Sequence, residues 1–241
     1  MVEAPSKGGA RTPLVLVPGL LCDERLWRYQ ADSLIRLADP QIASVIKGAS
    51  VAEMSRAVLG AAPERFALAG LSMGGYVAWE ILRVAPARVA RLALLDTSAR
   101  ADTPEQTAAR RKLIKLAQDG RFDEVPRKLL PMLIHPDRLD DAELTSEVLD
   151  MAESVGPEAF VSQEEAIIER PDSREGLKNI ACPTLVLCGR EDTVTPLRLH
   201  EEMASLIPNA RLRVVEGCGH LSTLERPEEV SAALRDWLAM M

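Results

Sequence analysis

The sequence predicts an α/β protein with a mostly parallel, doubly wound sheet that is interrupted by a helical insertion. Three observations support this prediction: short continuous apolar runs, helical patterns that alternate with them, and one long block without a strand pattern. A short apolar run is typical of a strand buried on both faces of a parallel sheet. Strands that alternate with helices build such sheets, and the helices then cover both faces.

The expected elements follow one another along the chain. Most of the apolar runs end close to a glycine, proline or aspartate, which are residues that favour turns. The sequence predicts strands at 14–17, 41–46, 66–70, 91–95, 183–188 and 212–215. It predicts helices at 26–37, 50–60, 73–85 and 227–239, and a frayed leader at 1–12.

Residues 100–176 have a helical, charged pattern without a strand. Connections in compact domains rarely exceed about 15 residues, so this block is predicted to be an insertion rather than a loop. We expect a core of residues 1–98 and 177–241 and a helical cap or lid at 99–176. A separate domain is the alternative, but strands on both sides favour a nested insertion. The block is interrupted by Pro126, Pro131, Pro136, Pro157 and Pro171.

Composition and charge limit the classes of partner. The 241 residues are 47% hydrophobic and 27% charged, which suits one globular domain with an insertion. The net charge of −7 argues against nucleic acid or an anionic membrane as partner and leaves a small-molecule substrate. We expect a cytoplasmic protein, because no segment resembles a signal peptide or reaches the about 18 apolar residues of a membrane span.

Cysteines and histidines give no sign of a metal site. The three histidines are widely separated, and the cysteines lack the paired spacing of metal ligands or of a redox motif. We therefore expect free, mostly buried thiols and no metal. The four cysteines are Cys22, Cys182, Cys188 and Cys218.

A serine lies between an expected strand and an expected helix, in the sequence Gly70-Leu71-Ser72-Met73-Gly74. The G-x-S-x-G spacing is typical of a nucleophile elbow, a strained turn that exposes the serine hydroxyl at the edge of a sheet. Glycines two residues before and after the serine avoid clashes in that turn, and the N-terminus of the following helix favours an anion. We therefore predict that Ser72 is a nucleophile; a generic glycine-rich turn is the alternative.

A nucleophilic serine needs a base, and His220 is the best-placed histidine. It follows a glycine-rich loop after the last expected strand, where open α/β sheets place ligand groups. It also follows Ser72 in the chain order that such sites use. His135 lies in the insertion and His200 in an expected surface helix, so we expect both to be structural or solvated.

An acid located between these two residues would orient the imidazole and stabilise its protonated form. Asp192 is the leading candidate, because it follows the second-last expected strand in the required chain order. Glu191 is the adjacent alternative. Asp96 ends the strand after the nucleophile helix and is a second alternative, although it could instead cap a helix or loop.

Backbone amides are expected to bind the oxyanion that forms during acyl transfer. One donor should be the amide of Met73, and the other that of Leu20 in the loop after the first strand. Cys22 and Cys218 lie on the two loops expected to border this site, so they are possible pocket residues. Small apolar filling of the core is the alternative for both thiols.

With these motifs the chain resembles the α/β-hydrolase superfamily over about residues 13–240. Its Leu-Ser-Met-Gly-Gly sequence is similar to that of bacterial serine esterases and of enol-lactonases of aromatic catabolism. The resemblance implies the α/β-hydrolase fold, a small helical lid and no cofactor. Pro18-Gly19 stands where many members have His-Gly, and Ser72 argues against epoxide hydrolases and haloalkane dehalogenases, which carry aspartate there. The matching segments are 17–20, 70–75, 183–192, 217–221 and 225–227.

Residues and resemblance together predict a serine hydrolase that cleaves a small carboxylic ester, thioester or lactone through an acyl-enzyme on Ser72. Two alternatives use the same site: hydrolysis of a C–C bond in a ring-fission diketone, and cofactor-free perhydrolysis. A non-catalytic ligand receptor on this scaffold is an alternative of a different class. The insertion carries no motif that identifies the acyl chain or the leaving group.

Overall fold

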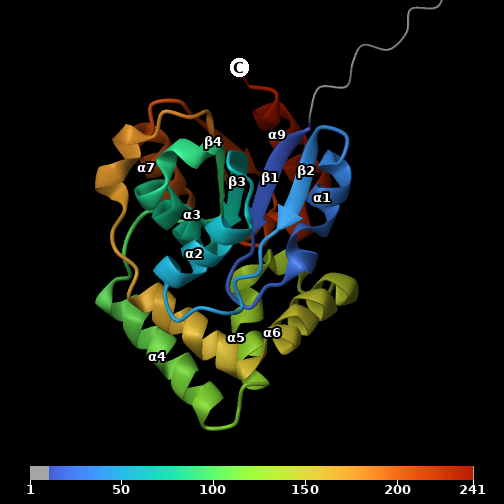
Figure 1. Cartoon of the computed structure of the whole chain (residues 1–241). Coiled ribbons are helices and arrows are strands. Elements are labelled where there is room, and N and C mark those ends of the chain that lie inside the picture. The colour runs from blue at the N-terminus through green and yellow to red at the C-terminus, as the bar shows by residue number, and fades with distance from the viewer. Residues whose placement is uncertain (1–10, 241) are drawn as a thin grey trace, which may run out of the picture.

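The computed structural model describes residues 11–240 and contains a six-stranded sheet (Figure 1). Every neighbouring pair of strands is parallel, and the order across the sheet is β2-β1-β3-β4-β5-β6. The predicted fold class is therefore confirmed. The strands are β1 (Thr12–Val17), β2 (Ala38–Ile42), β3 (Phe66–Leu71), β4 (Val89–Leu95), β5 (Thr184–Gly189) and β6 (Ala210–Val215).

Helices cover both faces of the sheet. One core cluster joins α1 and α9 to the first face, and another joins α2, α3 and α7 to the opposite face. Within residues 11–240, no helix is both long enough and apolar enough to cross a membrane. The helices of the core are α1 (Arg28–Leu34), α2 (Val51–Ala61), α3 (Met73–Val84), α7 (Leu197–Leu206), α8 (Ser222–Glu225) and α9 (Pro227–Leu238).

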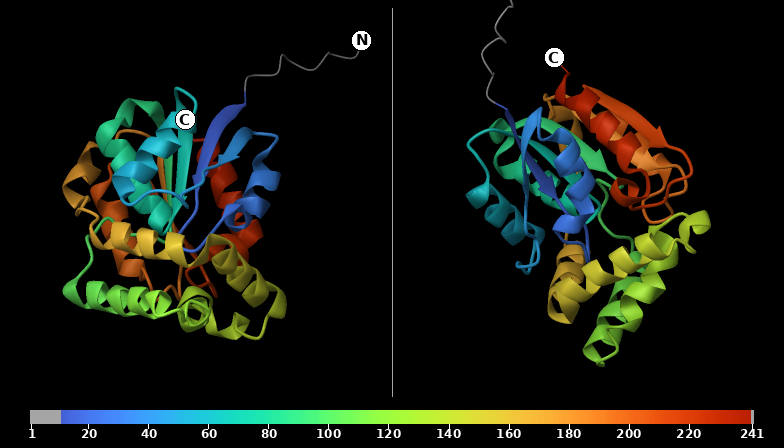
Figure 2. Two further views of the ribbon diagram at one scale, coloured as in Figure 1. Left: turned by 60° about the horizontal axis from the view of Figure 1, so that its bottom comes forward. Right: turned by 90° about the vertical axis from the view of Figure 1, so that its right-hand side faces the viewer.

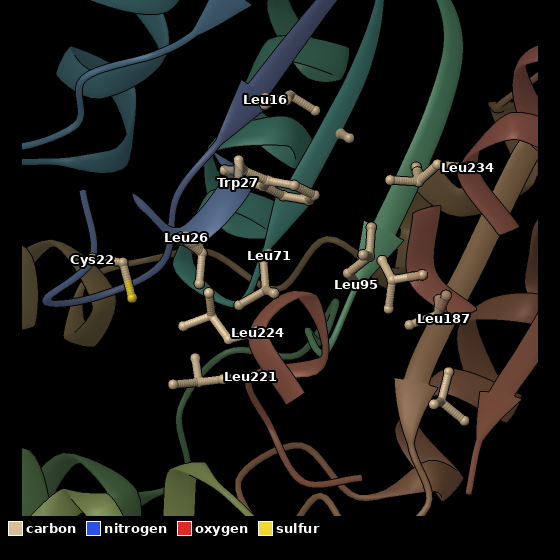
Figure 3. Packing of buried hydrophobic residues seen from close by; sticks show 14 of the residues in the cluster. Leu16, Cys22, Leu26, Trp27, Leu71, Leu95, Leu187, Leu221, Leu224 and Leu234 are labelled. Carbon is tan, nitrogen blue, oxygen red and sulfur yellow. The ribbon is translucent and has the colours of Figure 1, made fainter. Parts of the chain in front are cut away.

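The central strands are buried on both faces, as their apolar runs predict. All six residues of β3 and all six of β5 are buried. Figure 3 shows the cluster on one face, in which Leu71 and Leu95 from the sheet lie near Trp27 and Leu234 from the covering helices. Each such side chain contributes roughly 1.5–3 kcal/mol when it is removed from water.

The strand order reverses between β1 and β3, because β2 lies on one side of β1 and β3 on the other. The helix after β1 covers one face and the helix after β3 covers the opposite face. The loops that leave these two strands therefore diverge and leave a crevice at the carboxyl end of the sheet, where open α/β folds bind ligands. Ser72 directly follows β3, and Leu20 lies in the loop after β1.

Three helices between β4 and β5 lie together at one end of the sheet (Figures 1 and 2). They are α4 (Pro104–Gln118), α5 (Glu124–Leu133) and α6 (Ala142–Ile168). The structure places no strand between residues 100 and 176, as expected. Pro126 and Pro131 lie inside α5 instead of interrupting it, and α6 changes direction at Gly156, whose φ is 78°.

Two element boundaries differ from expectation. The strand expected at 41–46 is β2 at Ala38–Ile42, an edge strand that tolerates Pro40 because one side needs no hydrogen-bond donor. Val45 is apolar because it packs in the core beneath α2, and not because it belongs to the sheet. The helix expected at 26–37 begins as a 3-10 turn at Glu24–Trp27. The leader ends before Thr12, which opens β1, and its residues 1–10 lie outside the described part.

A small apolar cluster joins the insertion to the loop after β1. Phe160 of α6 is fully buried in it, next to Leu21, and its ring centroid lies 5.8 Å from that of Phe122. The cluster therefore fixes the insertion to the core at the edge of the crevice.

Phe160→Ala should lower the free energy of unfolding by about 3–5 kcal/mol, because it leaves a cavity in this cluster. Chemical denaturation measures the change. Lys128→Ala on the exposed surface of α5 is the matched control and should stay within about 0.5 kcal/mol of wild type. Equal stability of both variants would contradict the packing described.

Candidate active site

Ser72 occupies a strained turn between β3 and α3. Its φ is 53° and its ψ is −115°, a backbone conformation that non-glycine residues rarely adopt. The amide of Ser72 donates a hydrogen bond to the carbonyl oxygen of Leu95, 3.0 Å away, and this contact secures the turn to β4. The serine hydroxyl is thereby presented at the carboxyl end of the sheet.

The two glycines of the motif allow backbone segments to touch. A Cβ on Gly70 would lie 2.3 Å from the carbonyl oxygen of Gly74, and a Cβ on Gly74 would lie 2.1 Å from that of Val17. Real Cβ atoms do not approach oxygen this closely, so each position needs glycine. The sequence-based reason, a clash within the turn, holds for Gly70, whereas a Cβ on Gly74 would clash with the backbone of β1.

The structure brings the three predicted side chains into one hydrogen-bonded chain. His220 Nε2 lies 2.9 Å from Ser72 Oγ, and His220 Nδ1 lies 2.8 Å from Asp192 Oδ2. His220 and Asp192 are only 2% and 3% exposed. Neither Glu191 nor Asp96 contacts the imidazole, so the structure favours Asp192 among the three candidate acids.

Asp192 and His220 stabilise each other's charged forms. Burial opposes ionisation of Asp192, but the positive form of His220 and the hydrogen bonds from Thr195 lower the pKa of Asp192 to about 2. Burial also opposes protonation of His220, yet the charge and hydrogen bond of Asp192 raise the pKa of His220 above 6.5. The carboxylate is therefore ionised near neutral pH and stabilises a positive imidazolium.

Further hydrogen bonds hold Asp192 in place. Its Oδ1 accepts from the amides of Val194 and Thr195, at 2.8 and 2.9 Å. Its Oδ2 also accepts from the hydroxyl of Thr195, at 2.6 Å. These bonds hold the carboxylate independently of His220. The fixed carboxylate in turn limits the orientations that the imidazole can take.

The turn after β4 joins the loops of all three residues. Asp96 is fully buried and accepts hydrogen bonds from the amide of Gly189, at 3.0 Å, and from the hydroxyl of Ser222, at 2.5 Å. The first donor precedes the Asp192 loop and the second follows His220. The neighbouring Thr97 hydroxyl donates to the carbonyl oxygen of Ser72, at 2.8 Å. Asp96 therefore does not cap a helix or loop of its own turn, because its partners are the last residue of β5 and the first residue of α8.

The loop that carries His220 is also held by the insertion. The amides of His220 and Leu221 both donate to the carbonyl oxygen of Leu133, at the end of α5. Glu225 accepts from the amides of Gly219 and His135, at 3.0 and 2.7 Å. The position of the candidate base therefore depends on the insertion as well as on the sheet.

Two backbone amides near Ser72 are free for an oxyanion. Within residues 11–240, no hydrogen bond engages the amide of Leu20 or that of Met73. The Leu20 loop turns sharply at Leu21, where φ is 58°, and the amide of Leu21 donates to Gln163 Oε1 of α6, at 3.1 Å. Gln163 is fully buried and therefore holds the loop in one conformation.

Ser72, His220 and Leu20 border a cavity of about 340 Å³ between the sheet and the insertion. The rest of its wall is mostly apolar, with side chains from the core loops and from all three inserted helices. A larger cavity, of about 890 Å³, shares Tyr76 with it but contains neither Ser72 nor His220. The smaller cavity is therefore the one that can present a substrate to the serine.

The structure places the remaining candidate cysteines and histidines in different surroundings. Cys22 borders the cavity, whereas Cys218 is fully buried and does not. Burial raises the pKa of the Cys22 thiol to about 12. His200 is fully buried, so it is structural and not solvated, and its expected surface position was wrong; its Nε2 accepts from the amide of Thr97, and burial lowers its pKa to about 4. His135 has a structural contact, since its Nδ1 accepts from the amide of Asp137.

Three contributors were missed in the sequence. Gln163, Glu225 and the pairing of Asp96 with Ser222 act through contacts between distant segments. Gln163, for example, lies 142 residues from its partner Leu21. No local motif marks such residues, and a buried glutamine within a helical pattern cannot be told apart from a solvated one.

A strained serine between a buried strand and a helix, linked to a histidine and a carboxylate on a doubly wound sheet, defines the α/β-hydrolase class of fold. The chain belongs to the alpha/beta hydrolase family, whose model matches residues 14–233. The structural resemblance stated from the motifs is thereby confirmed.

Individual relatives are hydrolases of several kinds. A pimeloyl-acyl-carrier-protein methyl ester esterase from Aromatoleum aromaticum is 28% identical over 94% of this chain and 98% of its own length. A thermophilic esterase from Thermogutta terrifontis is 31% identical, with a TM-score of 0.87 over 95% of this chain and 90% of its own. An enol-lactonase from Burkholderia xenovorans shares the fold, with a TM-score of 0.87 at 24% identity over 96% and 93% of the two chains.

Gly74→Ala should destabilise the protein by several kcal/mol or prevent folding, because its Cβ would overlap the backbone of β1. Gly60→Ala is the matched control: nothing lies within 4 Å of that Cβ, and Gly60 lies inside α2. It should raise stability by about 0.5–1 kcal/mol. Thermal and chemical unfolding compare the two, and a tolerated Gly74→Ala would contradict the close contact.

Proposed function

We propose that this protein is a serine hydrolase that cleaves a small carboxylic ester, thioester or lactone through an acyl-enzyme on Ser72. The observation that supports this most directly is the hydrogen-bonded chain from Ser72 through His220 to Asp192 at the wall of an apolar cavity. A buried base within 2.9 Å of a strained serine is the arrangement that activates a hydroxyl for attack.

In the proposed reaction, Ser72 Oγ attacks the carbonyl carbon of the substrate while His220 Nε2 takes the hydroxyl proton. The amides of Leu20 and Met73 bind the negative oxygen of the tetrahedral intermediate, each contributing about 2.7–4 kcal/mol. The intermediate then expels the leaving group, which receives the proton from His220. A water molecule, deprotonated by His220, attacks the acyl-enzyme and releases the carboxylic acid and Ser72.

The relatives support this class of chemistry without identifying a substrate. Two of them are named esterases and one an enol-lactonase. The cavity of about 340 Å³ suits a small organic substrate and not a polymer. We further propose that the protein acts in the cytoplasm on a small molecule, with neither nucleic acid nor membrane as partner.

Ser72→Ala should reduce turnover of short 4-nitrophenyl esters more than about 1,000-fold while the fold survives, because the nucleophile is lost. Steady-state rates and circular dichroism measure the two properties. Ser205→Ala, on an exposed part of α7, is the matched control and should retain the wild-type rate. Undiminished hydrolysis by Ser72→Ala would contradict the proposal.

The same experiment distinguishes the alternatives when the substrates are varied. A panel of esters, thioesters, lactones, a dienol ring-fission product and peroxide with carboxylate covers the reaction classes. Preference for the dienol indicates C–C hydrolysis, and peroxide-dependent halogenation indicates perhydrolysis. Tight binding of a ligand with negligible turnover of every member would overturn the enzymatic proposal.

The pH dependence of kcat/KM should show an acid limb above pH 6.5. His220 acts as a base only when neutral, and the Asp192 carboxylate raises its pKa, so activity falls as pH decreases through that raised value. Initial rates between pH 5 and 9, at about unit steps or finer, measure the limb. A limb below 6.5 would contradict the raised pKa.

Asp192→Asn should lower kcat by about 10,000-fold, because the amide neither stabilises the imidazolium nor fixes its tautomer. The remaining activity should show its acid limb at lower pH, since the positive form of His220 loses its partner. Glu191→Gln is the matched control, because Glu191 binds the amide of Cys218 and not the imidazole. A larger loss of kcat in Glu191→Gln than in Asp192→Asn would show that Asp192 is not the acid that orients His220.

A further inference from the structure

The cavity beside Ser72 contains a second set of polar side chains that the proposed mechanism does not use. Tyr76 of α3, Arg110 of α4 and Glu164 of α6 all border it. Most of the other residues around the cavity are apolar, so these three groups make one part of its wall polar. Buried polar groups are costly unless they are paired, and those that stay partly unpaired mark a position where a ligand can complete the pairing.

Arg110 is held rigidly but has donors left over. Its Nε donates to Asp102, at 2.8 Å, and its Nη1 donates to Glu164, at 2.6 Å; both carboxylates are 1% exposed. Burial opposes the charge, but Glu164, Tyr76 and Asp102 raise the pKa of Arg110, so it remains positive. Within residues 11–240, no hydrogen bond engages Nη2. The guanidinium is thus a fixed donor at the cavity wall.

Tyr76 contributes a second free group at the same place. Its side chain is 5% exposed, and the guanidinium of Arg170 stacks 4.1 Å from its ring centroid. Across the described part of the chain, no hydrogen bond engages its hydroxyl. Tyr76 lies in the first turn of α3, which begins directly after Ser72, so its backbone is close to the nucleophile.

The charges around Arg110 determine which kind of ligand group fits. Arg110 and Arg170 carry two positive charges, and Asp102 and Glu164 carry two negative ones, paired at 2.5 to 2.8 Å. The network is therefore neutral before a ligand enters. Glu164 Oε1 is buried without a hydrogen-bond partner within residues 11–240, so a carboxylate nearby would bring two further acceptor oxygens and a third negative charge beside an acceptor that already lacks a donor. A neutral acceptor meets no such repulsion.

We propose that Tyr76 and Arg110 form a polar subsite that binds a neutral oxygen acceptor, such as a keto, hydroxyl or amide oxygen, on the acyl part of the substrate. This inference rests on the proposed function, since it describes the substrate of the same serine. The subsite selects acyl chains that carry such an oxygen over plain alkyl chains and over chains that end in a carboxylate.

Three matched substrates test the subsite: the 4-nitrophenyl esters of hexanoic acid, 5-oxohexanoic acid and glutaric acid (as its half ester). Hexanoate and 5-oxohexanoate have the same carbon chain and differ at carbon 5, where a keto oxygen replaces two hydrogens. Glutarate carries a carboxylate at that carbon in place of the keto and methyl groups. A second set is shorter by one carbon: the esters of pentanoic, 4-oxopentanoic and succinic acids. It tests a subsite that lies closer to Ser72. Ser72→Ala serves as the blank, because a substrate carboxylate can attack its own ester without enzyme.

The wild-type enzyme should prefer the keto ester of one chain length about tenfold over the alkyl ester in kcat/KM, the effect expected of one hydrogen bond to a charged donor. Tyr76→Phe and Arg110→Lys should each reduce this ratio several-fold, because phenylalanine lacks the hydroxyl donor and the compact ammonium of lysine cannot reproduce the planar fork of the guanidinium. Tyr76→Phe should lower kcat/KM for the keto ester more than for the alkyl ester, because only the keto oxygen can accept from the lost hydroxyl. Lys115→Gln, on the exposed side of α4, is the matched control and should keep the wild-type ratio.

The outcomes separate the two proposals. No hydrolysis of any ester by the wild type would overturn the proposed function. Hydrolysis with equal kcat/KM for keto and alkyl esters at both lengths would overturn the subsite alone, as would a ratio that Tyr76→Phe does not change. Preference for the carboxylate esters would overturn the neutral ligand class. If Arg110→Lys fails to fold, Tyr76→Phe decides, because its hydroxyl holds no other part of the protein.

Discussion

The turn at the end of β4 is the constraint on which the site geometry depends. Asp96 and Thr97 are adjacent, yet they bind the segments that carry the nucleophile, the acid and the base. Burial, and then the negative charge of Asp192, raise the pKa of Asp96 well above its ordinary value, so this position is energetically costly. The two hydrogen bonds that Asp96 accepts offset part of that cost. Burial of Asp96 therefore lowers the stability of the fold, while the contacts of Asp96 and Thr97 fix the three segments relative to one another.

Backbone strain is concentrated in the same region. Among residues 11–240, the non-glycine residues with a positive φ are Leu21, Ser72 and Asp96. Leu21 lies in the loop after β1, next to the free amide of Leu20. Ser72 is the candidate nucleophile, and Asp96 binds the segments that lead to the acid and from the base. Such conformations persist only where the surroundings enforce them, and they are typical of functional sites. The contacts of Gln163 and Thr97 supply that enforcement here.

Local sequence signals explain which features could be predicted. β3 and β5 have unbroken apolar runs, and Ser72 and His220 lie beside strand ends in a recognisable order, so their positions followed from short segments. β2 is an edge strand with alternating exposure, and the apolar residues after it belong to the core instead. His200 has charged neighbours but points inward to Thr97, a contact between residues 103 positions apart.

Two consecutive residues of α6 make contacts in two different places. Gln163 holds the loop of the free amides, while Glu164 borders the cavity and pairs with Arg110. Neighbouring positions on a helix point about 100° apart, so one short segment contacts both the loop beside Ser72 and the wall of the cavity. A change in this helix that shifts or rotates it would therefore alter the cavity wall and the loop beside Ser72 together, whereas a substitution confined to one face need not. Evolution or engineering of a new substrate range in this chain must consequently conserve one face of α6 while it varies the next.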